Sequence, residues 1–376
     1  MKILHTSDWH LGRSLHGHPL NDDQDHALKQ ILELLRQEPY DALIVAGDIF
    51  DKATPSNEAA RMLGGWLTDV RKIQPQLPIV MISGNHDNGP RLACMAGLLD
   101  HQAVYLRGET GRIDEPIVLR DKTGGEAEIW ALPYLLPGAL GEALASQSGA
   151  MEEALRRIRE RQNLGRSQIL VAHCFVRGGQ GSDSERTLIG TATLIEAELF
   201  HGFDYVALGH LHRRQSPAPH VHYSGSIARY SFSEEGYDKV VLSVELDPGA
   251  PCRIRSTRLT DLRPMKKWTD SLENLLHSPR YNGQTDDYVE LTLAPPCSAG
   301  NPMDALRKRW THLLSFHNSP EIETVSKVEG PSHVAGPRDL VNDFAVFSRM
   351  YTGGAELDLD AAFQEVLTAS QAQETA

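Results

Sequence analysis

The sequence predicts an α/β protein with more than one domain. Its 376 residues are too many for one small core, and 40% hydrophobic with 23% charged residues is the balance of a soluble globular protein. Through the first half, short aliphatic or β-branched runs alternate with segments of helical period, which is the pattern of βαβ units. These observations favour a largely parallel or mixed sheet that is flanked by helices.

Six apolar runs in the first half predict strands. Each run is short, rich in Val, Ile and Leu, and followed by a polar turn. The runs lie at residues 2–7, 41–47, 78–84, 128–134, 168–174 and 204–210. Helical periodicity follows the first two runs, at 22–37 and 56–72. Because the runs are apolar almost throughout, the strands should be buried on both faces.

After residue 211 the pattern changes to strands that are linked by turns. Segments 221–227, 239–246 and 252–259 suggest a second sheet. The segment LRPMKKWTD, at 262–270, breaks this pattern, and a β-α-β series follows it at 286–293, 302–314 and 321–329. We therefore expect a main domain at 1–266, a small α+β domain at 267–335 and terminal helices within 336–376.

Two short amphipathic helices are expected at the end of the chain. Segments 341–351 and 359–367 each place aromatic and aliphatic residues on one helical face. Such a face either covers the core of its own domain or docks on a partner. Both interpretations stay open at this point.

Charge and cysteine content narrow the class of protein. The formal charge of −13 argues against binding nucleic acid by bulk electrostatics. A polyanion would have to bind through a local group of positively charged residues. One local cluster of arginines lies at 156–166, where a solvated helix face is the simpler reading. The four cysteines are far apart, which fits reduced thiols. Neither a leader segment nor a run of roughly 18 apolar residues is present, so we expect a cytoplasmic protein with no membrane contact.

Polar residues gather where the predicted strands end. In open α/β sheets, ligands bind outside the carboxyl ends of the strands, so these clusters should converge on one crevice. The clusters are Asp8 with His10, Asp48 with Asp51, Asn85 with His86 and Asp87, His173, and His210 with His212. A single histidine at such a place is more often structural than a ligand. Five clusters in this order, each after an apolar run, are improbable by chance.

The chemistry of these side chains points to a pair of divalent cations. Carboxylate and amide oxygens with neutral imidazoles suit Mn²⁺, Fe²⁺ or Zn²⁺, and the clusters contain no cysteine. The clusters offer more ligands than one ion accepts. A carboxylate on a tight turn can bridge two ions about 3.5–4 Å apart. Asp48 is the best candidate for that bridge.

These motifs, DxH, GDxxD, GNHD, VAH and GHxH, resemble those of the calcineurin-like metallophosphoesterases, from about residue 1 to 246. The resemblance implies the metallophosphoesterase two-sheet sandwich flanked by helices. It also implies one metal on Asp8, His10, Asp48 and His212, and a second on Asp48, Asn85, His173 and His210. His86 would face the scissile phosphate without binding metal, and Asp87 would orient its imidazole.

Within that family the sequence is most similar to the SbcD group of bacterial nuclease subunits. The resemblance is carried by HTSDWHLG, GDIFDKATPS, GNHD and, above all, YSGSIARYSFSEEGYDKV after GHLH. It implies a Mn²⁺-dependent DNA phosphodiesterase, with exonuclease action on duplex ends and endonuclease action on single strands and hairpins, in which an activated hydroxide attacks the phosphate. The turn of Ser224, Gly225 and Ser226 would face a substrate phosphate, unless it is a plain hairpin turn.

The same resemblance implies partners. SbcD proteins act with SbcC, an ATPase with a long coiled coil, as a complex with two copies of each. The 267–335 segment would then be a capping domain, and the terminal helices would grip the base of the coiled coil. A helix at 90–101 would form a dimer contact through Leu92, Met95, Ala96 and Leu99, or else would pack on its own sheet.

Rival functions within and beyond the fold share part of this pattern. A cyclic-nucleotide or small-molecule phosphodiesterase would share every metal ligand, but the segment after Pro264 favours a polymer substrate and a partner. A phosphoprotein phosphatase would carry an arginine shortly after Asp51, where this chain has KATPS. A scaffold without turnover would be expected to lack a ligand, and all of them are present.

Overall fold

The computed structural model of the protein describes residues 1–141, 144, 146–185, 194–247, 250–296 and 302–318. All of them fall within one compact unit of the chain, Met1–Pro320. The expected strand at 321–329 and the expected terminal helices at 336–376 lie outside these residues. No helix within the described ranges combines the length and the apolar character that crossing a bilayer requires.

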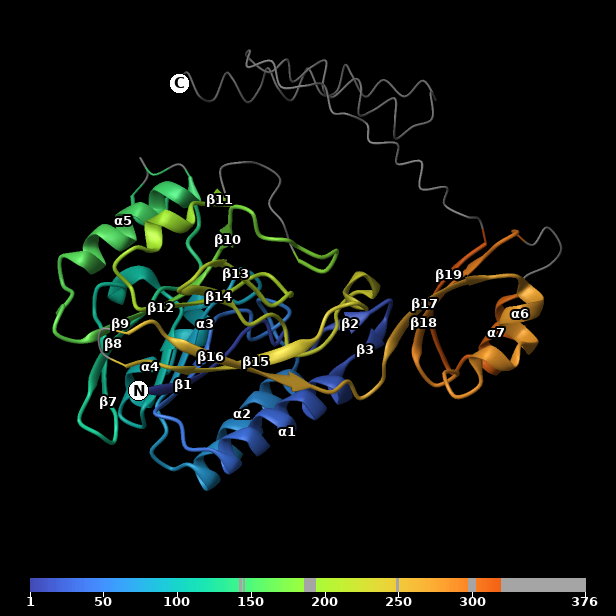
Figure 1. The fold of residues 1–376 in the computed structure, drawn as a ribbon, viewed down its shortest axis with the longest axis horizontal. Helices are drawn as coiled ribbons and strands as arrows, with labels where there is room; N and C mark the ends of the chain where they lie inside the picture. Colours follow the sequence, from blue (N-terminus) through green and yellow to red (C-terminus); the bar gives the residue numbers. More distant parts are fainter. Residues whose placement is uncertain (142–143, 145, 186–193, 248–249, 297–301, 319–376) are drawn as a thin grey trace, which may run out of the picture. The chain divides into compact units, whose positions relative to one another are not determined.

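Two six-stranded sheets form the centre of the molecule (Figure 1). The first sheet has the order β16 (Arg253–Leu259), β15 (Lys239–Glu245), β1 (Lys2–Thr6), β4 (Ala42–Val45), β5 (Ile79–Ile82) and β6 (Val104–Arg107). The second sheet has the order β13 (Gln215–Ala218), β14 (Val221–Tyr223), β12 (Tyr205–Gly209), β9 (Ser167–His173), β8 (Glu126–Ala131) and β7 (Ile117–Arg120).

Four consecutive strands of each sheet are parallel. Strands β1, β4, β5 and β6 run together in the first sheet, and β8, β9, β12 and β14 run together in the second. The remaining strands β15, β16, β13 and β7 pair antiparallel to their neighbours. Within each sheet the carboxyl ends of the parallel strands therefore share one edge.

The division of strands between sheets differs from the expectation. The six runs of the first half were expected in one sheet, but three form part of each. The strands after residue 211 do not form a sheet of their own: β14 joins the second sheet, whereas β15 and β16 complete the first. Sheet membership depends on pairing between distant segments, because an apolar run fits either sheet equally well.

Helices cover the outer face of each sheet. The side chains between the sheets, among them Ile44 and Val171, are apolar and fully buried. Helices α1 (Asn21–Gln37) and α2 (Asn57–Ile73) pack on the outer face of the first sheet, and α5 (Gln147–Arg159) packs on the second (Figure 1). The expected α/β sandwich of two sheets flanked by helices is confirmed.

The segment that was expected to be one helix at 90–101 is two short helices. They are α3 (Gly89–Ala93) and α4 (Ala96–Asp100). Leu92 is buried, and Ala96 and Leu99 pack on the core of the first sheet, so this face of the segment is not available to a partner. Of the four residues expected in a contact, Met95 alone is largely exposed, at 54%, and its neighbour Leu98 is 63% exposed.

Short elements complete the main body. They are the strand pairs β2 (Ser14–Leu15) with β3 (His18–Pro19) and β10 (Phe175–Val176) with β11 (Leu194–Ile195), and the 3₁₀ turns η1 (Thr110–Arg112), η3 (Ala197–Phe200) and η4 (Phe232–Glu234). A further 3₁₀ turn, η5 (Pro279–Tyr281), belongs to the third sheet that follows.

A third, parallel sheet follows the sandwich. It consists of β17 (Met265–Asp270), β18 (Tyr288–Leu293) and β19 (His312–His317), with α6 (Leu272–His277) and α7 (Met303–Arg309). The segment that breaks the sequence pattern is thus itself a strand, β17. A separate small core that includes Leu275 and Trp310 holds this sheet together. It joins the sandwich where the Tyr288 hydroxyl donates a 2.8 Å hydrogen bond to Asp23 on α1.

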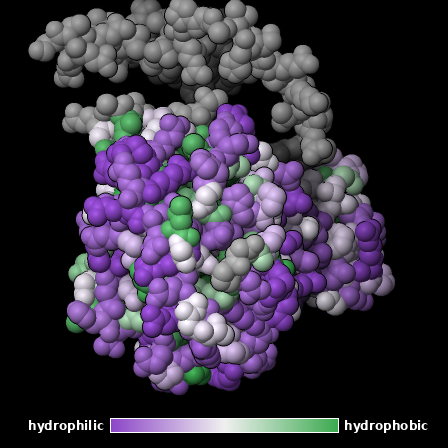
Figure 2. All heavy atoms as spheres, turned by 60° about the vertical axis from the view of Figure 1, so that its left-hand side comes forward, coloured by the Kyte–Doolittle hydropathy of each residue, from purple (hydrophilic) through white to green (hydrophobic). Residues whose placement is uncertain are grey.

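The arginine cluster of α5 is neutralised locally. Arg156 and Arg157 pair with Glu153, while Arg166 pairs with Glu126 and Glu128. The simpler reading, a solvated helix face, therefore describes it, and the charges of these three arginines are offset by neighbouring carboxylates. Hydrophilic side chains dominate the face that Figure 2 shows, with apolar ones in small separate patches.

Candidate metal centre

The backbone is strained where the predicted ligands lie. A left-handed backbone is uncommon outside glycine and costs about 1–3 kcal/mol per residue, so it persists where surrounding structure enforces it. Among the described residues, four of the six non-glycine residues with positive φ are predicted ligands: Asp8 (53°), His10 (45°), Asp48 (48°) and His210 (105°). This strain turns the side chains at the ends of β1, β4 and β12 toward one point.

The first group of ligands joins the loops after β1 and β12. Asp8, His10 and His212 are fully or almost fully buried, and one ligand atom of each lies within 4.8 Å of the others. The Nε2 atoms of His10 and His212 face each other at 3.0 Å. Two imidazole nitrogens and a carboxylate oxygen that converge in a buried space are a fitting donor set for a divalent cation.

The second group joins the loops after β5, β9 and β12. The Asn85 side-chain oxygen lies 3.0 Å from His173 Nε2 and 3.0 Å from His210 Nδ1. His173 Nδ1 contacts the Ala46 carbonyl at 2.9 Å, which ties the end of β9 to the end of β4 across the two sheets. With Nδ1 donating there, Nε2 of the neutral ring is the atom left to bind a cation.

Asp48 lies between the two groups. Its Oδ2 is 3.5 Å from His10 Nε2 and 3.5 Å from His173 Nε2, so one oxygen faces both sets of ligands. Its Oδ1 accepts a 2.8 Å hydrogen bond from the backbone N–H of His86, which fixes the rotation of the carboxylate. This is the arrangement that a bridging carboxylate requires. The described residues therefore fit a pair of divalent cations.

Burial and mutual charge perturb the acids and bases of the centre. Burial raises the pKa of Asp8 to about 6, against the opposing effect of His173 and His212. Burial acts in the same direction on Asp48, but the neighbouring His173 and His10 hold the pKa of Asp48 well below its usual range. Burial alone would lower the pKa of His173, yet Asp48 raises it to about 9. Burial lowers the pKa values of His10 and His210 to about 3. A buried charge without a compensating opposite charge costs free energy. A bound cation would compensate the carboxylates of this centre.

Two glycines allow the loops to approach each other. A Cβ on Gly84 would lie 2.1 Å from Asp48 Oδ1 and 2.4 Å from the Asp48 backbone nitrogen. A Cβ on Gly47, which has a φ of +90°, would lie 2.3 Å from His173 Nδ1. Neither position can hold a side chain unless a metal ligand moves.

We expect Gly84→Ala to disrupt the centre. The added methyl group must displace Asp48, so the change should cost about 1–3 kcal/mol of stability and also weaken Mn²⁺ binding. Gly64→Ala is the matched control, because a Cβ at this exposed position on α2 meets nothing within 4 Å. Thermal unfolding and calorimetric Mn²⁺ titration of both variants would test this. Equal Mn²⁺ affinity in the two would contradict the packing argument.

His86 lies beside the cluster. Its ring centroid is 4.6 Å from that of His10, and its Nδ1 contacts the backbone carbonyl of Asp51 at 2.8 Å. A carbonyl only accepts, so Nδ1 carries a hydrogen and the ring orientation is set. A ligand atom of His86 also lies within 4.8 Å of those of His10 and Asp48, so distance by itself would permit His86 to bind metal.

Asp87 holds the backbone of two loops. Its carboxylate accepts hydrogen bonds from the backbone N–H groups of Ile49, Phe50 and Gly84, at 2.9–3.0 Å. It therefore joins the loop after β4 to the loop after β5. The group that the structure places against the His86 ring is the Asp51 carbonyl, which comes from a different loop. Asp87 thus acts on the position of both loops, and these three hydrogen bonds do not involve the imidazole.

The Ser224, Gly225 and Ser226 turn is hydrogen-bonded to the loops that carry ligands. All three residues are buried, and the N–H of Ser226 donates to the His212 carbonyl at 3.2 Å. The hydroxyl of Ser7 bonds that of Ser224 at 2.8 Å and donates to the Asp8 carboxylate at 2.5 Å. The turn lies behind the ligands and supports them. The N–H of Ser226 is already used, which favours the alternative of a plain turn.

Several residues around the centre were missed by reasoning from the sequence. Tyr134 stacks near His210 with a centroid distance of 6.5 Å. Arg13 lies 3.4 Å from Asp51 and packs over the Tyr230 ring. Glu234, buried completely, lies 3.3 Å from His212 Nδ1. Acidic residues are mostly exposed, so the residue type gave no reason to expect Glu234 in a buried site. Its only signal in the sequence was its place in the SbcD-like run YSGSIARYSFSEEGYDKV.

Comparisons with known proteins agree with this geometry. The calcineurin-like phosphoesterase family model matches residues 1–214. The chain is 30% identical over 325 residues to the SbcD subunit of the nuclease SbcCD from Staphylococcus epidermidis. This alignment covers 85% of each of the two chains. The chain is 29% identical over 332 residues to the protein of the same name from Staphylococcus saprophyticus, again over 85% of each.

A solved structure from Thermus thermophilus aligns with a TM-score of 0.41 and 15% identity, over 69% of this chain and 99% of that one, which is too weak to support a conclusion. The family match and the curated relatives carry the assignment. The chain belongs to the calcineurin-like phosphoesterases, a family of hydrolases here acting on phosphodiester bonds, and within that family it groups with the SbcD nuclease subunits.

Proposed function

We propose that this protein is a Mn²⁺-dependent DNA phosphodiesterase, a double-strand exonuclease and a single-strand and hairpin endonuclease. It processes DNA ends in repair, recombination and replication, in the cytoplasm. The observation that carries the proposal is the position of Asp48, with one oxygen 3.5 Å from a ligand of each group. The relatives from the SbcCD complex, named as nucleases, support DNA as the substrate.

The seven predicted ligands hold the two cations. Asp8, His10, Asp48 and His212 bind the first ion, and Asp48, Asn85, His173 and His210 bind the second. When bound, such a pair neutralises the phosphate oxygens and activates a water for attack in line. Manganese is the proposed metal because the resemblance to the SbcD group implies it. The mixture of carboxylate, amide and imidazole donors without thiolate is compatible with Mn²⁺, as it is with Fe²⁺ and Zn²⁺.

The protein itself positions the proton near the leaving oxygen. His86, with Nδ1–H held by the Asp51 carbonyl, presents the other edge of its ring to the scissile phosphate, where it holds a proton at Nε2. Asp87 keeps the loops of Asp48 and His86 together through its three backbone hydrogen bonds. It is therefore a positioning residue in this proposal.

The substrate class can be tested directly. The purified protein is incubated with Mn²⁺ and an end-labelled duplex, a hairpin or a cyclic nucleotide, each beside a His86→Ala sample. Cleavage of the duplex and hairpin that is lost in His86→Ala supports the proposal. If only the cyclic nucleotide is consumed, the alternative holds, namely a cyclic-nucleotide or small-molecule phosphodiesterase of the same fold.

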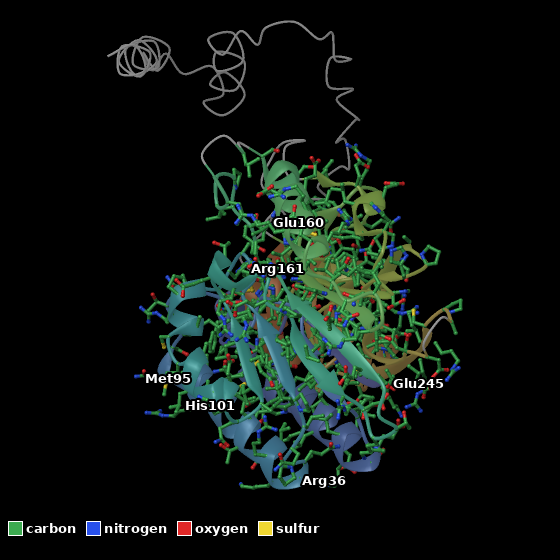
Figure 3. All side chains as sticks on the ribbon, turned by 90° about the vertical axis from the view of Figure 1, so that its left-hand side faces the viewer. Arg36, Met95, His101, Glu160, Arg161 and Glu245 are labelled. Atoms are coloured by element: carbon green, nitrogen blue, oxygen red, sulfur yellow. The ribbon has the colours of Figure 1, made fainter. Side chains whose placement is uncertain are left out.

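We also propose the partners of this protein. It acts with an SbcC-type coiled-coil ATPase in a heterotetramer, with residues 267–335 as a capping domain and 336–376 as the ATPase-binding segment. The relatives named as subunits of SbcCD support the partner. Two copies of the chain meet through the apolar side chains around the α3–α4 turn. Met95 projects outward from the body there (Figure 3).

The homodimer contact makes a specific prediction. Because Met95 and Leu98 are 54% and 63% exposed, changing both to Glu should bury four charges in a dimer and shift the protein to monomer. Light scattering after size-exclusion chromatography measures the mass. Leu164→Glu is the control, since Leu164 is 83% exposed but lies in the turn after α5. A double variant that keeps the wild-type dimer mass would refute this contact.

A further inference from the structure

A buried ion pair lies directly behind His212. Glu234 and Lys239 are almost inaccessible to solvent, and their Oε2 and Nζ atoms are 2.5 Å apart. Neither residue belongs to the proposed ligand sets. A buried pair contributes little net stability compared with apolar residues of similar size. Its position against a metal ligand therefore calls for a reason.

The pair holds His212 at several points. Lys239 Nζ donates to the His212 carbonyl at 3.0 Å and to the Ser226 hydroxyl at 2.7 Å. Glu234 Oε1 lies 3.3 Å from His212 Nδ1. Ser184 contacts His212 Nδ1 at 2.6 Å, and its hydroxyl donates to Glu234 Oε1. The ring and the backbone of His212 are thus held by the same charged pair.

The polarity of these contacts determines which nitrogen of His212 carries the hydrogen. An ammonium group only donates, and the carboxylate that receives it only accepts. The Ser184 hydroxyl uses its hydrogen on Glu234, so its oxygen must accept from His212 Nδ1–H. The neutral ring therefore presents a bare Nε2, and that atom faces His10 Nε2 at 3.0 Å in the first ligand group.

We propose that Glu234, paired with Lys239, is a positioning residue that fixes the tautomer and the orientation of His212 through Ser184, so that Nε2 is presented to the first cation. The inference rests on the two-cation centre of the proposed function and extends it to residues that bind no ion. Removing a carboxylate group that orients a metal-binding histidine typically lowers metal affinity by about 10–100-fold.

The test compares two neighbouring acids. Glu234→Gln removes the charge behind His212 and should lower Mn²⁺ affinity about 10–100-fold at one of two calorimetric sites, with the other unchanged. Glu235→Gln is the matched control, because Glu235 pairs with Lys266, at 3.0 Å, rather than with Lys239. It should bind both ions as the wild type does. Circular dichroism checks that each variant is folded.

A second readout separates positioning from a merely structural role. In metal-free protein with ¹⁵N-labelled histidine, the signals of His212, assigned by their loss in His212→Asn, should report hydrogen on Nδ1. In Glu234→Gln the tautomers should mix. If Glu234→Gln does not fold, Ser184→Ala interrupts the same connection and should give the same shift and the same loss at one site.

The outcomes distinguish this inference from the proposed function. If the wild type binds fewer than two Mn²⁺ ions, the two-cation centre fails and this inference fails with it. If the wild type binds two ions, and Glu234→Gln or Ser184→Ala binds both with unchanged affinity and an unchanged His212 tautomer, only the positioning role is overturned.

Discussion

Asp48→Asn should abolish binding of both metal ions and reduce phosphodiester cleavage by about 10³-fold or more. Asparagine keeps an oxygen for the His86 N–H, which bonds Asp48 Oδ1 at 2.8 Å. It replaces the other oxygen, the one that faces His10 and His173, with an amide nitrogen that cannot bind a cation. One substitution therefore removes a ligand from each position and leaves the loop anchored.

Metal content after equilibration with Mn²⁺, measured by mass spectrometry of the metal together with calorimetry, checks this expectation. Asp41→Asn is a suitable control. Asp41 immediately precedes the first residue of β4, at the end of the strand away from Asp48, and accepts a hydrogen bond from the backbone N–H of Lys2. Two tightly bound ions in Asp48→Asn would end the bridge assignment. Loss of a single ion would mean that Asp48 serves only one position.

His86→Ala should give the opposite combination, with two Mn²⁺ ions bound and cleavage reduced by about 10²–10⁴-fold. The expected loss follows from removing the proton-holding group, since the Asp51 carbonyl fixes Nδ1 and aims the ring. Metal binding should survive because the bridging carboxylate is oriented by the backbone N–H of His86, which alanine retains.

The metal content of His86→Ala decides between two roles for this residue. His86 lies within ligand distance of His10 and Asp48, so a drop to one bound ion would identify it as a ligand and would overturn the proposed assignment. His101→Ala is the control, because His101 is an exposed residue just after α4 (Figure 3). It should leave both metal content and cleavage unchanged.

Most of the metal cluster could be anticipated from local pattern. Apolar runs identified most of the central strands, and each predicted ligand lies at the end of such a run or just after it. Parallel strands carry their carboxyl ends to a shared edge, so the order of motifs predicted that Asp8, Asp48 and Asn85 would meet. The ligand from β9, His173, meets them as well, although its strand lies in the other sheet. The two sheets come together at this end through the contact of His173 with the Ala46 carbonyl.

The residues that support the ligands could not be anticipated in the same way. Ser7 meets Ser224 across 217 positions, and two of the three partners of Asp87 lie in a loop almost forty residues earlier. A motif records which side chains stand together in the chain, but it does not record which backbone N–H groups lack a partner. The contacts of Asp87 with the backbone of two loops, and those of Ser224 behind Asp8, could not be inferred from the motifs for this reason.

By itself the sequence determined the fold class, most of the central strands and the polar residues that converge at their ends, because apolar periodicity and the residues at strand ends are local properties. Only the tertiary structure decided which strands share a sheet, which face of 90–101 is free, and which acid stands behind His212. Those outcomes depend on desolvation and pairing between distant segments. Glu234 and Glu235 are the same residue type at adjacent positions. Only the surrounding fold buries the first and leaves the second more accessible, so that their carboxylates differ in desolvation free energy.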